Sequence, residues 1–116
     1  SWMYEGLLRL VGRFAPPVPV ERARELLAAG GELIDVRSPE EFAAGHLPGA
    51  RNVPLEQVAD VLAAEKERCL LCYCRSGLRA QRAIQVLHAQ GLSEVHKLGG
   101  MSRVEQEPLP MSGESS

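Results

Sequence analysis

The feature that most constrains the fold is a short apolar run that ends at a cysteine and passes almost directly into a helical pattern. The run covers residues 68–73, the cysteine is Cys74, and apolar side chains then recur at Ala80, Ala83, Ile84 and Leu87. Intervals of three and four predict a helix with one buried face, whereas a short bounded apolar run predicts a buried strand. The rest of the chain is therefore expected to support the loop between this strand and this helix.

Similar apolar runs alternate with helical patterns along most of the chain. One helix is predicted to end at residue 29, and another to begin after Ser38. A third is predicted from Pro54 to about residue 66, and a fourth directly after the cysteine loop. Strands are predicted at residues 18–20, 32–37, 52–53, 68–73 and 94–98. This alternation predicts a three-layer α/β/α sandwich with a mainly parallel five-stranded sheet, in which the strand with Pro19 lies at an edge.

The helix after residue 37 carries a clear start signal. Ser38 is suited to cap the helix, Pro39 to its first position, and Glu41 to return a hydrogen bond three residues after the cap. A capping box is therefore predicted here.

The chain is expected to comprise one folded domain with two flanking segments. Residues 1–17 are predicted to form an amphipathic helix and a proline-rich connection, residues 18–104 the domain, and residues 105–116 a disordered tail. Docking of residues 1–14 on their own domain, or fraying of this helix in solvent, is favoured over a contact with a membrane or a partner.

Charge and hydropathy exclude several classes of function. The net charge is −2 and the arginines near Cys74 are few, so nucleic-acid binding is not expected. A run of roughly 18 apolar residues is absent, so no membrane span is predicted. A cytoplasmic location is expected, but the first residue is Ser1, so a periplasmic or membrane-tethered protein whose leader was removed stays an alternative.

The cysteines indicate neither a disulfide framework nor a metal site. Cys69, Cys72 and Cys74 lie within six positions, an odd number of thiols in one stretch. Cys69 and Cys72 have C-x-x-C spacing but fall on an apolar strand, where their side chains point to opposite faces. Core packing is therefore favoured for both, and no metal or cofactor is predicted, because a second pair of zinc ligands at finger-like spacing is lacking.

The loop from Cys74 onward has the properties of an anion site. A thiol is an effective nucleophile at neutral pH only where its thiolate is stabilised by a helix N-terminus or by cations. Ser76 and Gly77 allow successive backbone N–H groups to converge, and Arg75 and Arg79 add positive charge. Cys74 is therefore the predicted nucleophile.

Two further charged residues end the predicted strand at residues 32–37. Ligands of α/β proteins bind beyond the carboxyl ends of the strands, which brings Asp35 and Arg37 into consideration. Asp35 is predicted to be structural, pairing with Arg37 and capping the next loop, although a direct role in the site stays open. Arg37 is predicted to lie in the substrate pocket.

Three segments of the chain resemble the hallmark motifs of single-domain rhodaneses, the thiosulfate sulfurtransferase-like family. They cover residues 33–42, 45–53 and 74–79, and the similarity extends over about residues 18–101. The resemblance implies that Cys74 takes a sulfur atom from an anionic donor such as thiosulfate. The persulfide would then pass this sulfur to cyanide or to a thiol, which a protein can carry. By the same resemblance, the substrate cradle comprises Arg75, Ser76, Gly77, Leu78 and Arg79, with Arg37 as a nearby cation.

The resemblance also bears on His46 and on the end of the domain. His46 lies in the second motif, where it is expected to fix the turn, and a role as a base for Cys74 is the less favoured alternative. Many relatives have an aromatic residue in a final helix, whereas here Met101 and Ser102 lead into the polar tail. A closing helix is therefore in doubt.

Two other functions compete with free sulfur transfer. A cysteine phosphatase or arsenate reductase also has a cysteine-to-arginine loop. Here the loop has six residues, from Cys74 to Arg79. The resemblance to phosphatases of this fold implies a loop of seven residues, so a phosphatase is not favoured. A rhodanese-like module could instead relay sulfur or bind a partner without free turnover. The relay is the stronger rival.

Overall fold

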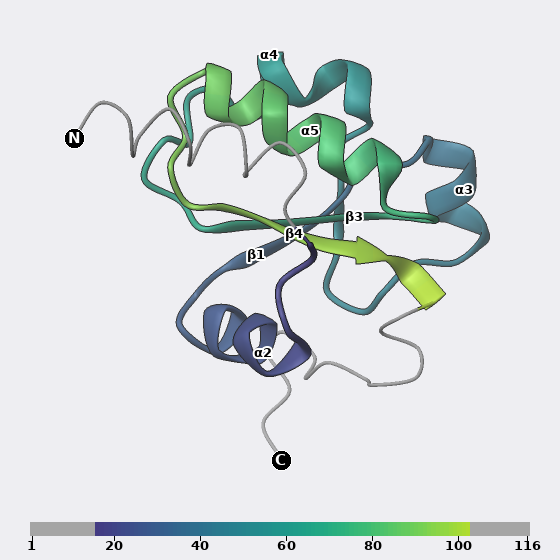
Figure 1. The fold of residues 1–116 in the computed structure, drawn as a ribbon. Coiled ribbons are helices and arrows are strands. Elements are labelled where there is room, and N and C mark those ends of the chain that lie inside the picture. The colour runs from purple at the N-terminus through teal and green to yellow at the C-terminus, as the bar shows by residue number, and fades with distance from the viewer. Residues whose placement is uncertain (1–15, 103–116) are drawn as a thin grey trace.

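The computed structural model describes residues 16–102, which form a parallel sheet covered by helices on both faces (Figure 1). The strands are β1 (Glu32–Asp35), β2 (Arg51–Asn52), β3 (Leu70–Cys74) and β4 (Val95–Gly100), in the order β2-β1-β3-β4. All three strand pairs are parallel. The helices are α2 (Val20–Ala28), α3 (Pro39–Ala44), α4 (Val58–Leu62) and α5 (Leu78–Ala89), with a 3₁₀ turn, η1, at Leu55–Gln57.

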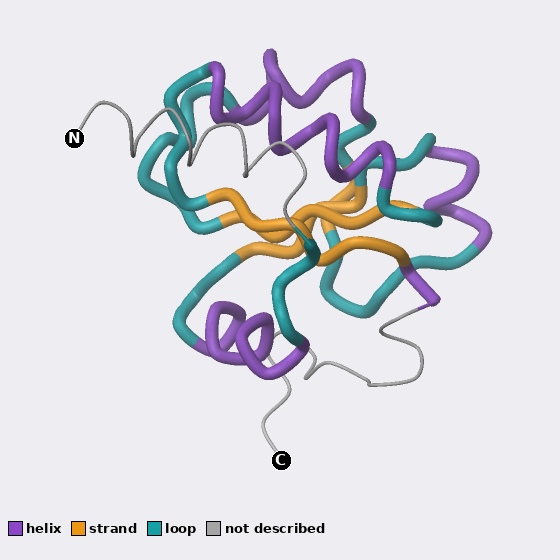
Figure 2. The backbone as a smooth tube through the Cα atoms, in the orientation of Figure 1, coloured by secondary structure: helices purple, strands orange, loops and turns teal. Residues whose placement is uncertain are grey.

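The sheet is the middle of three layers. Helix α2 covers one face, and α4 and α5 cover the other, as the separation of helices and strands in Figure 2 shows. Alternate strand residues supply the two cores. The core under α4 and α5 includes Ile34, Leu70, Cys72 and Cys74, whereas the core under α2 includes Leu33, Leu71, Tyr73 and Leu98. The predicted parallel α/β sandwich is confirmed.

The predicted number of strands differs from the structure, which has four among the described residues rather than five. Residues 18–20 make no additional strand, because Val20 already begins α2. Val18 donates its N–H to the carbonyl of Lys97 at 2.8 Å, beside edge strand β4. Proline has no N–H to donate, so Pro19 cannot extend this pairing into a ladder.

Several element boundaries also differ from the predicted ones. The helix expected from Pro54 to about residue 66 is divided into η1 and the short α4, which ends at Leu62. The last strand continues through Gly99 to Gly100, and the β3–β4 register shifts between Cys72 and Tyr73. The predicted capping box at the start of α3 is confirmed, with both of its hydrogen bonds present.

The predicted N-terminal helix and C-terminal tail lie largely outside the described residues. Met101 and Ser102, which follow β4, are in helical conformation at the end of the described region. Within residues 16–102, no helix has the length and apolar character needed to cross a membrane.

Candidate active site

The predicted site residues lie together at the carboxyl ends of the strands, along one side of the sheet. In the β1–β3 register Asp35 pairs with Tyr73, and in the β3–β4 register Cys74 pairs with Gly100. Helix α3 and the start of α5 lie at this same edge, at the right of Figure 1. The ligand-binding edge of a parallel sheet thus holds the cysteine loop.

Cys74 is the last residue of β3, and its side chain is fully buried on the α5 side of the sheet. Its Sγ accepts the backbone N–H of Gly77 at 2.9 Å and that of Ala80 at 3.4 Å. Both donors lie at the N-terminus of α5, where the helix dipole favours negative charge. The sulfur therefore occupies a position that favours an anion.

Glycine at position 77 makes this arrangement possible. Gly77 caps α5 with φ at 102°, a left-handed conformation that a residue with a Cβ rarely adopts. The chain therefore turns sharply after the strand, and the N–H of Gly77 points back at the Cys74 sulfur.

The end of β4 fixes the other side of the loop. Met101 donates its N–H to the carbonyl of Arg75 at 3.2 Å. A Cβ added at Gly100 would lie 3.0 Å from the Arg75 carbonyl oxygen, so the two backbones approach closely only because Gly100 has no side chain.

Arg79, predicted as a substrate-binding cation, is engaged by Glu41. Its Nη1 lies 2.6 Å from Glu41 Oε1, and its Nη2 lies 3.1 Å from Glu41 Oε2. These hydrogen bonds are the main cause that lowers the pKa of Glu41 to about 2, and the capping contact with Ser38 lowers it further. Part of the positive charge of Arg79 is therefore neutralised by a residue of α3.

Arg37 and Asp35 form a buried pair behind the site. Arg37 donates from Nη2 to Asp35 Oδ2 at 2.7 Å and from Nε to Asp35 Oδ1 at 3.0 Å. The same Nη2 donates to the carbonyl of Gly45 at 2.7 Å, and the hydroxyl of Tyr73 donates to Asp35 Oδ2 at 2.7 Å. Burial, followed by the neighbouring carboxylate, raises the pKa of Tyr73. The Asp35–Arg37 pair therefore joins β1, β3 and the end of α3.

An open pocket of about 550 Å³ lies on this edge, and it brings two arginines together. Arg37 and Arg75 both line it, together with Glu41. Arg75 is exposed, whereas Arg37 is buried and committed to Asp35. Arg75 is therefore better placed than Arg37 or Arg79 to receive an anion. The full lining is Arg37, Glu41, Ala44, Gly45, Arg75, Met101 and Ser102.

His46 lies in the turn after α3 and is held by local contacts. Its ring stacks on Phe42 with the ring centres 3.7 Å apart, and its Nδ1 lies 2.9 Å from the carbonyl oxygen of Phe42. Both contacts are to α3, and the side chain is otherwise exposed. This geometry agrees with the expected role in fixing the turn.

Two residues gain roles that the sequence reasoning did not assign. Glu41 was predicted to cap α3, but its pairing with Arg79 joins residues 38 positions apart, and no local pattern indicates it. Tyr73 was interpreted as a strand residue, yet its hydroxyl binds Asp35 and also accepts the N–H of Leu47 at 3.0 Å. A tyrosine among aliphatic strand residues is a signal for such a buried polar contact.

Comparison with known proteins decides the family. The model of the rhodanese-like domain matches residues 19–107, which is most of the chain. The chain belongs to the rhodanese-like domain family. The thiosulfate sulfurtransferase GlpE of Pseudomonas aeruginosa (strain LESB58) is 37% identical over 89 residues, covering 76% of this chain and 77% of the relative. Membership of this family and similarity to this enzyme support sulfurtransferase activity.

Solved rhodanese structures share the fold. The human single-domain sulfurtransferase TSTD1 matches with a TM-score of 0.67 and 32% identity, covering 83% of this chain and 99% of that one. A rhodanese with anions from E. coli matches with a TM-score of 0.61 and 28% identity, covering 70% of this chain and 95% of that one. The rhodanese-like fold predicted from the three motifs is thus confirmed.

Proposed function

We propose that this rhodanese-like domain moves a sulfane sulfur from a small anionic donor such as thiosulfate to cyanide or a thiol, through a persulfide on Cys74. The observation that carries the proposal is the Cys74 sulfur, which accepts two backbone N–H groups at the N-terminus of α5. Such preorganised donors stabilise an anionic sulfur without a metal or a cofactor.

The reaction has two displacement steps. The Cys74 thiolate attacks the outer sulfur of thiosulfate, an S–S bond forms to Cys74, and sulfite leaves with the electron pair of the broken bond. The acceptor, cyanide or a thiolate, then attacks the outer sulfur of the persulfide. Thiocyanate or a new persulfide leaves, and the Cys74 thiolate is regenerated.

The surroundings of the sulfur suggest how the donor enters. Arg75 carries an exposed positive charge beside the 550 Å³ pocket, which favours an anionic donor. The Cys74 side chain itself has no exposed area, so the cysteine loop or its surroundings must move before the donor reaches it. Ser76 and Leu78 are exposed and belong to that loop.

Mass spectrometry after incubation with thiosulfate tests the proposal. The protein should gain one sulfur atom on Cys74, the Cys74→Ser variant should gain none, and the matched Cys69→Ser variant should behave as the parent. Equal loss of the adduct in both variants would contradict the assignment of the nucleophile.

A sulfur relay to a protein thiol is the second candidate. Leu78, within the cysteine loop, is 78% exposed and lines a second, largely apolar hollow of about 520 Å³. An exposed apolar side chain beside the sulfur favours an acceptor larger than cyanide. Formation of the persulfide without turnover of cyanide would identify the relay, whereas rapid turnover would identify the free enzyme.

A further inference from the structure

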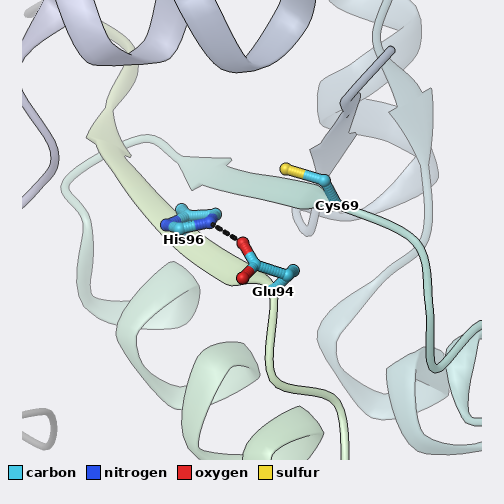
Figure 3. Close-up of side chains that lie close together, drawn as sticks. All are labelled: Cys69, Glu94 and His96. Carbon is cyan, nitrogen blue, oxygen red and sulfur yellow. Dashed lines mark hydrogen bonds and ion pairs between the residues drawn. The ribbon is translucent and has the colours of Figure 1, made fainter. Parts of the chain in front are cut away.

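A second group of reactive side chains lies at the amino-terminal ends of the strands, whereas Cys74 lies at their carboxyl ends. Cys69 directly precedes β3, Glu94 directly precedes β4, and His96 is in β4, with their potential ligand atoms all within 4.8 Å of one another (Figure 3). We propose that Cys69, Glu94 and His96 bind a divalent transition metal ion, with Zn²⁺ the best match.

The backbone holds these three side chains together. Leu70 donates its N–H to the carbonyl of Glu94 at 2.9 Å, which fixes the start of β3 against the start of β4. Glu32 donates its N–H to the carbonyl of Cys69 at 2.9 Å, which fixes Cys69 against β1. Glu94 and His96 are two residues apart, a spacing that puts both side chains on one face of an extended segment. The backbone positions of the three residues are therefore fixed by the sheet.

The imidazole and the carboxylate already converge. His96 Nε2 lies 3.0 Å from Glu94 Oε2, as the dashed line in Figure 3 shows. Zinc binds thiolate sulfur at about 2.3 Å and imidazole nitrogen or carboxylate oxygen at about 2.0–2.2 Å, so ligand atoms around one tetrahedral ion lie roughly 3.5 Å apart. The three potential ligand atoms, all within 4.8 Å of one another, therefore lie close to the spacing that one ion requires.

The donor set selects the kind of ion. A thiolate and an imidazole favour zinc and similar transition metals, whereas magnesium and calcium prefer oxygen ligands alone. Three protein ligands leave a fourth position for water. With ionised Cys69 and Glu94 and neutral His96, the two negative charges balance the charge of Zn²⁺.

Binding requires Cys69 to lose its proton. Burial, followed by the charge of Glu94, raises the pKa of the Cys69 thiol, while Arg22 of α2 acts in the opposite direction. The metal ion replaces this proton, and His96 supplies an imidazole nitrogen as a further ligand. Zinc should therefore bind more weakly as the pH falls.

The other cysteines do not complete this site. Cys72 is fully buried in the core under α5, and burial raises the pKa of its thiol to about 12. Cys69 packs against the core under α2, on the other face of the sheet. The C-x-x-C spacing therefore gives no chelating pair, and Glu94 and His96 take the place of the second cysteine.

The test uses the full chain carrying Cys74→Ser, which removes the thiol of the proposed sulfur carrier as a competing ligand. Equilibrium dialysis should show one bound Zn²⁺ per chain, and Co²⁺ should give a thiolate-to-cobalt charge-transfer band. Adding Cys69→Ser should abolish this band, and adding His96→Asn should weaken Zn²⁺ binding at least about tenfold. Adding His88→Asn, at an exposed histidine of α5, is the matched control and should leave binding unchanged.

Melting curves without metal confirm that each variant folds. Absence of Zn²⁺ binding to the folded Cys74→Ser chain would overturn the proposal, as would binding that persists unchanged in the Cys69→Ser and His96→Asn variants. The result does not depend on sulfur transfer, so its failure leaves the proposed function untouched.

Discussion

Arg79 and Glu41 form a two-point ion pair that joins the first turn of α5 to the first turn of α3. The two helices flank the cysteine loop, so the pair acts as a brace beside the proposed nucleophile. Arg79 can contribute to the field around Cys74, but part of its charge is already compensated. The exposed Arg75 is the stronger candidate for direct contact with an anionic donor.

Replacement of Glu41 tests this division of roles. In Glu41→Gln the charge of Arg79 is no longer neutralised, so the KM for thiosulfate should fall roughly two- to threefold at low salt and approach the parent value as salt screens the charge. Steady-state kinetics at several ionic strengths measure the effect. Glu40→Gln, at the exposed neighbouring position, is the control. A higher KM in Glu41→Gln would show that the brace matters more than the charge.

The two loop arginines should differ when each is replaced by alanine. Arg75→Ala should raise the KM for thiosulfate roughly tenfold, because the variant loses a charged hydrogen bond to the donor. The Tm should change little, because the variant loses no hydrogen bond or ion pair within the described part of the protein. Arg79→Ala should lower both activity and Tm. Arg82→Ala removes another exposed cation of α5 and should change neither by much. Equal effects of Arg75→Ala and Arg82→Ala would refute direct donor binding by Arg75.

The conformation of Gly77 predicts a sharp local effect. Gly77→Ala places a Cβ on a residue with φ at 102°, which costs about 1–2 kcal/mol and displaces the N–H that points at Cys74. Activity should fall more than stability, which urea unfolding and kinetics on the same preparation would show. Gly30→Ala, also at positive φ but in the turn after α2, should lower stability alone.

The Asp35–Arg37 pair should be needed for folding. Asp35→Asn leaves the buried guanidinium of Arg37 without its counter-charge, which should destabilise the domain by about 3 kcal/mol or more. Denaturant unfolding measures the loss, and Asp60→Asn at an exposed position of α4 is the control. Asp35→Asn with parental stability would mean that Arg37 keeps other partners sufficient for its charge.

The low pKa of Glu41 gives a pH dependence with a defined sign. Folding lowers this pKa from 4.5 to about 2, so the ion pair stabilises the folded state above pH 4.5, and this contribution is lost as the pH falls toward 2. Between pH 4.5 and 2, Tm should therefore fall more steeply for the parent than for Glu41→Gln. Parallel curves would show that the carboxylate has no stabilising partner in solution.

Local sequence patterns predicted most of the elements correctly, and the assignment of Cys74 as the nucleophile stays a prediction. The intervals of apolar residues predicted α5, and Ser38 with Glu41 predicted the cap of α3. The prediction of a strand at residues 18–20 was wrong, because the chain enters α2 directly after Pro19. A pattern of alternate apolar residues does not reveal how far a segment pairs with its neighbour.

The remaining features depend on tertiary structure. The pairing of Glu41 with Arg79 requires α3 and α5 to meet at the same end of the sheet. The proximity of Cys69 to Glu94 and His96 depends on the register of β3 against β4, which the chain sets through backbone hydrogen bonds. Neither relationship can be predicted from residues that are close together in the sequence.

The absence of a side chain at Gly100 has a consequence for mutational scans. A methyl group there would press on the carbonyl of Arg75 and on the backbone of Ser76, so the cysteine loop would have to shift by a few tenths of an ångström while the core stayed intact. In a selection for sulfur transfer, Gly100 should therefore be as intolerant as a residue that touches the substrate. In a selection for folding alone, substitutions at Gly100 should be largely tolerated.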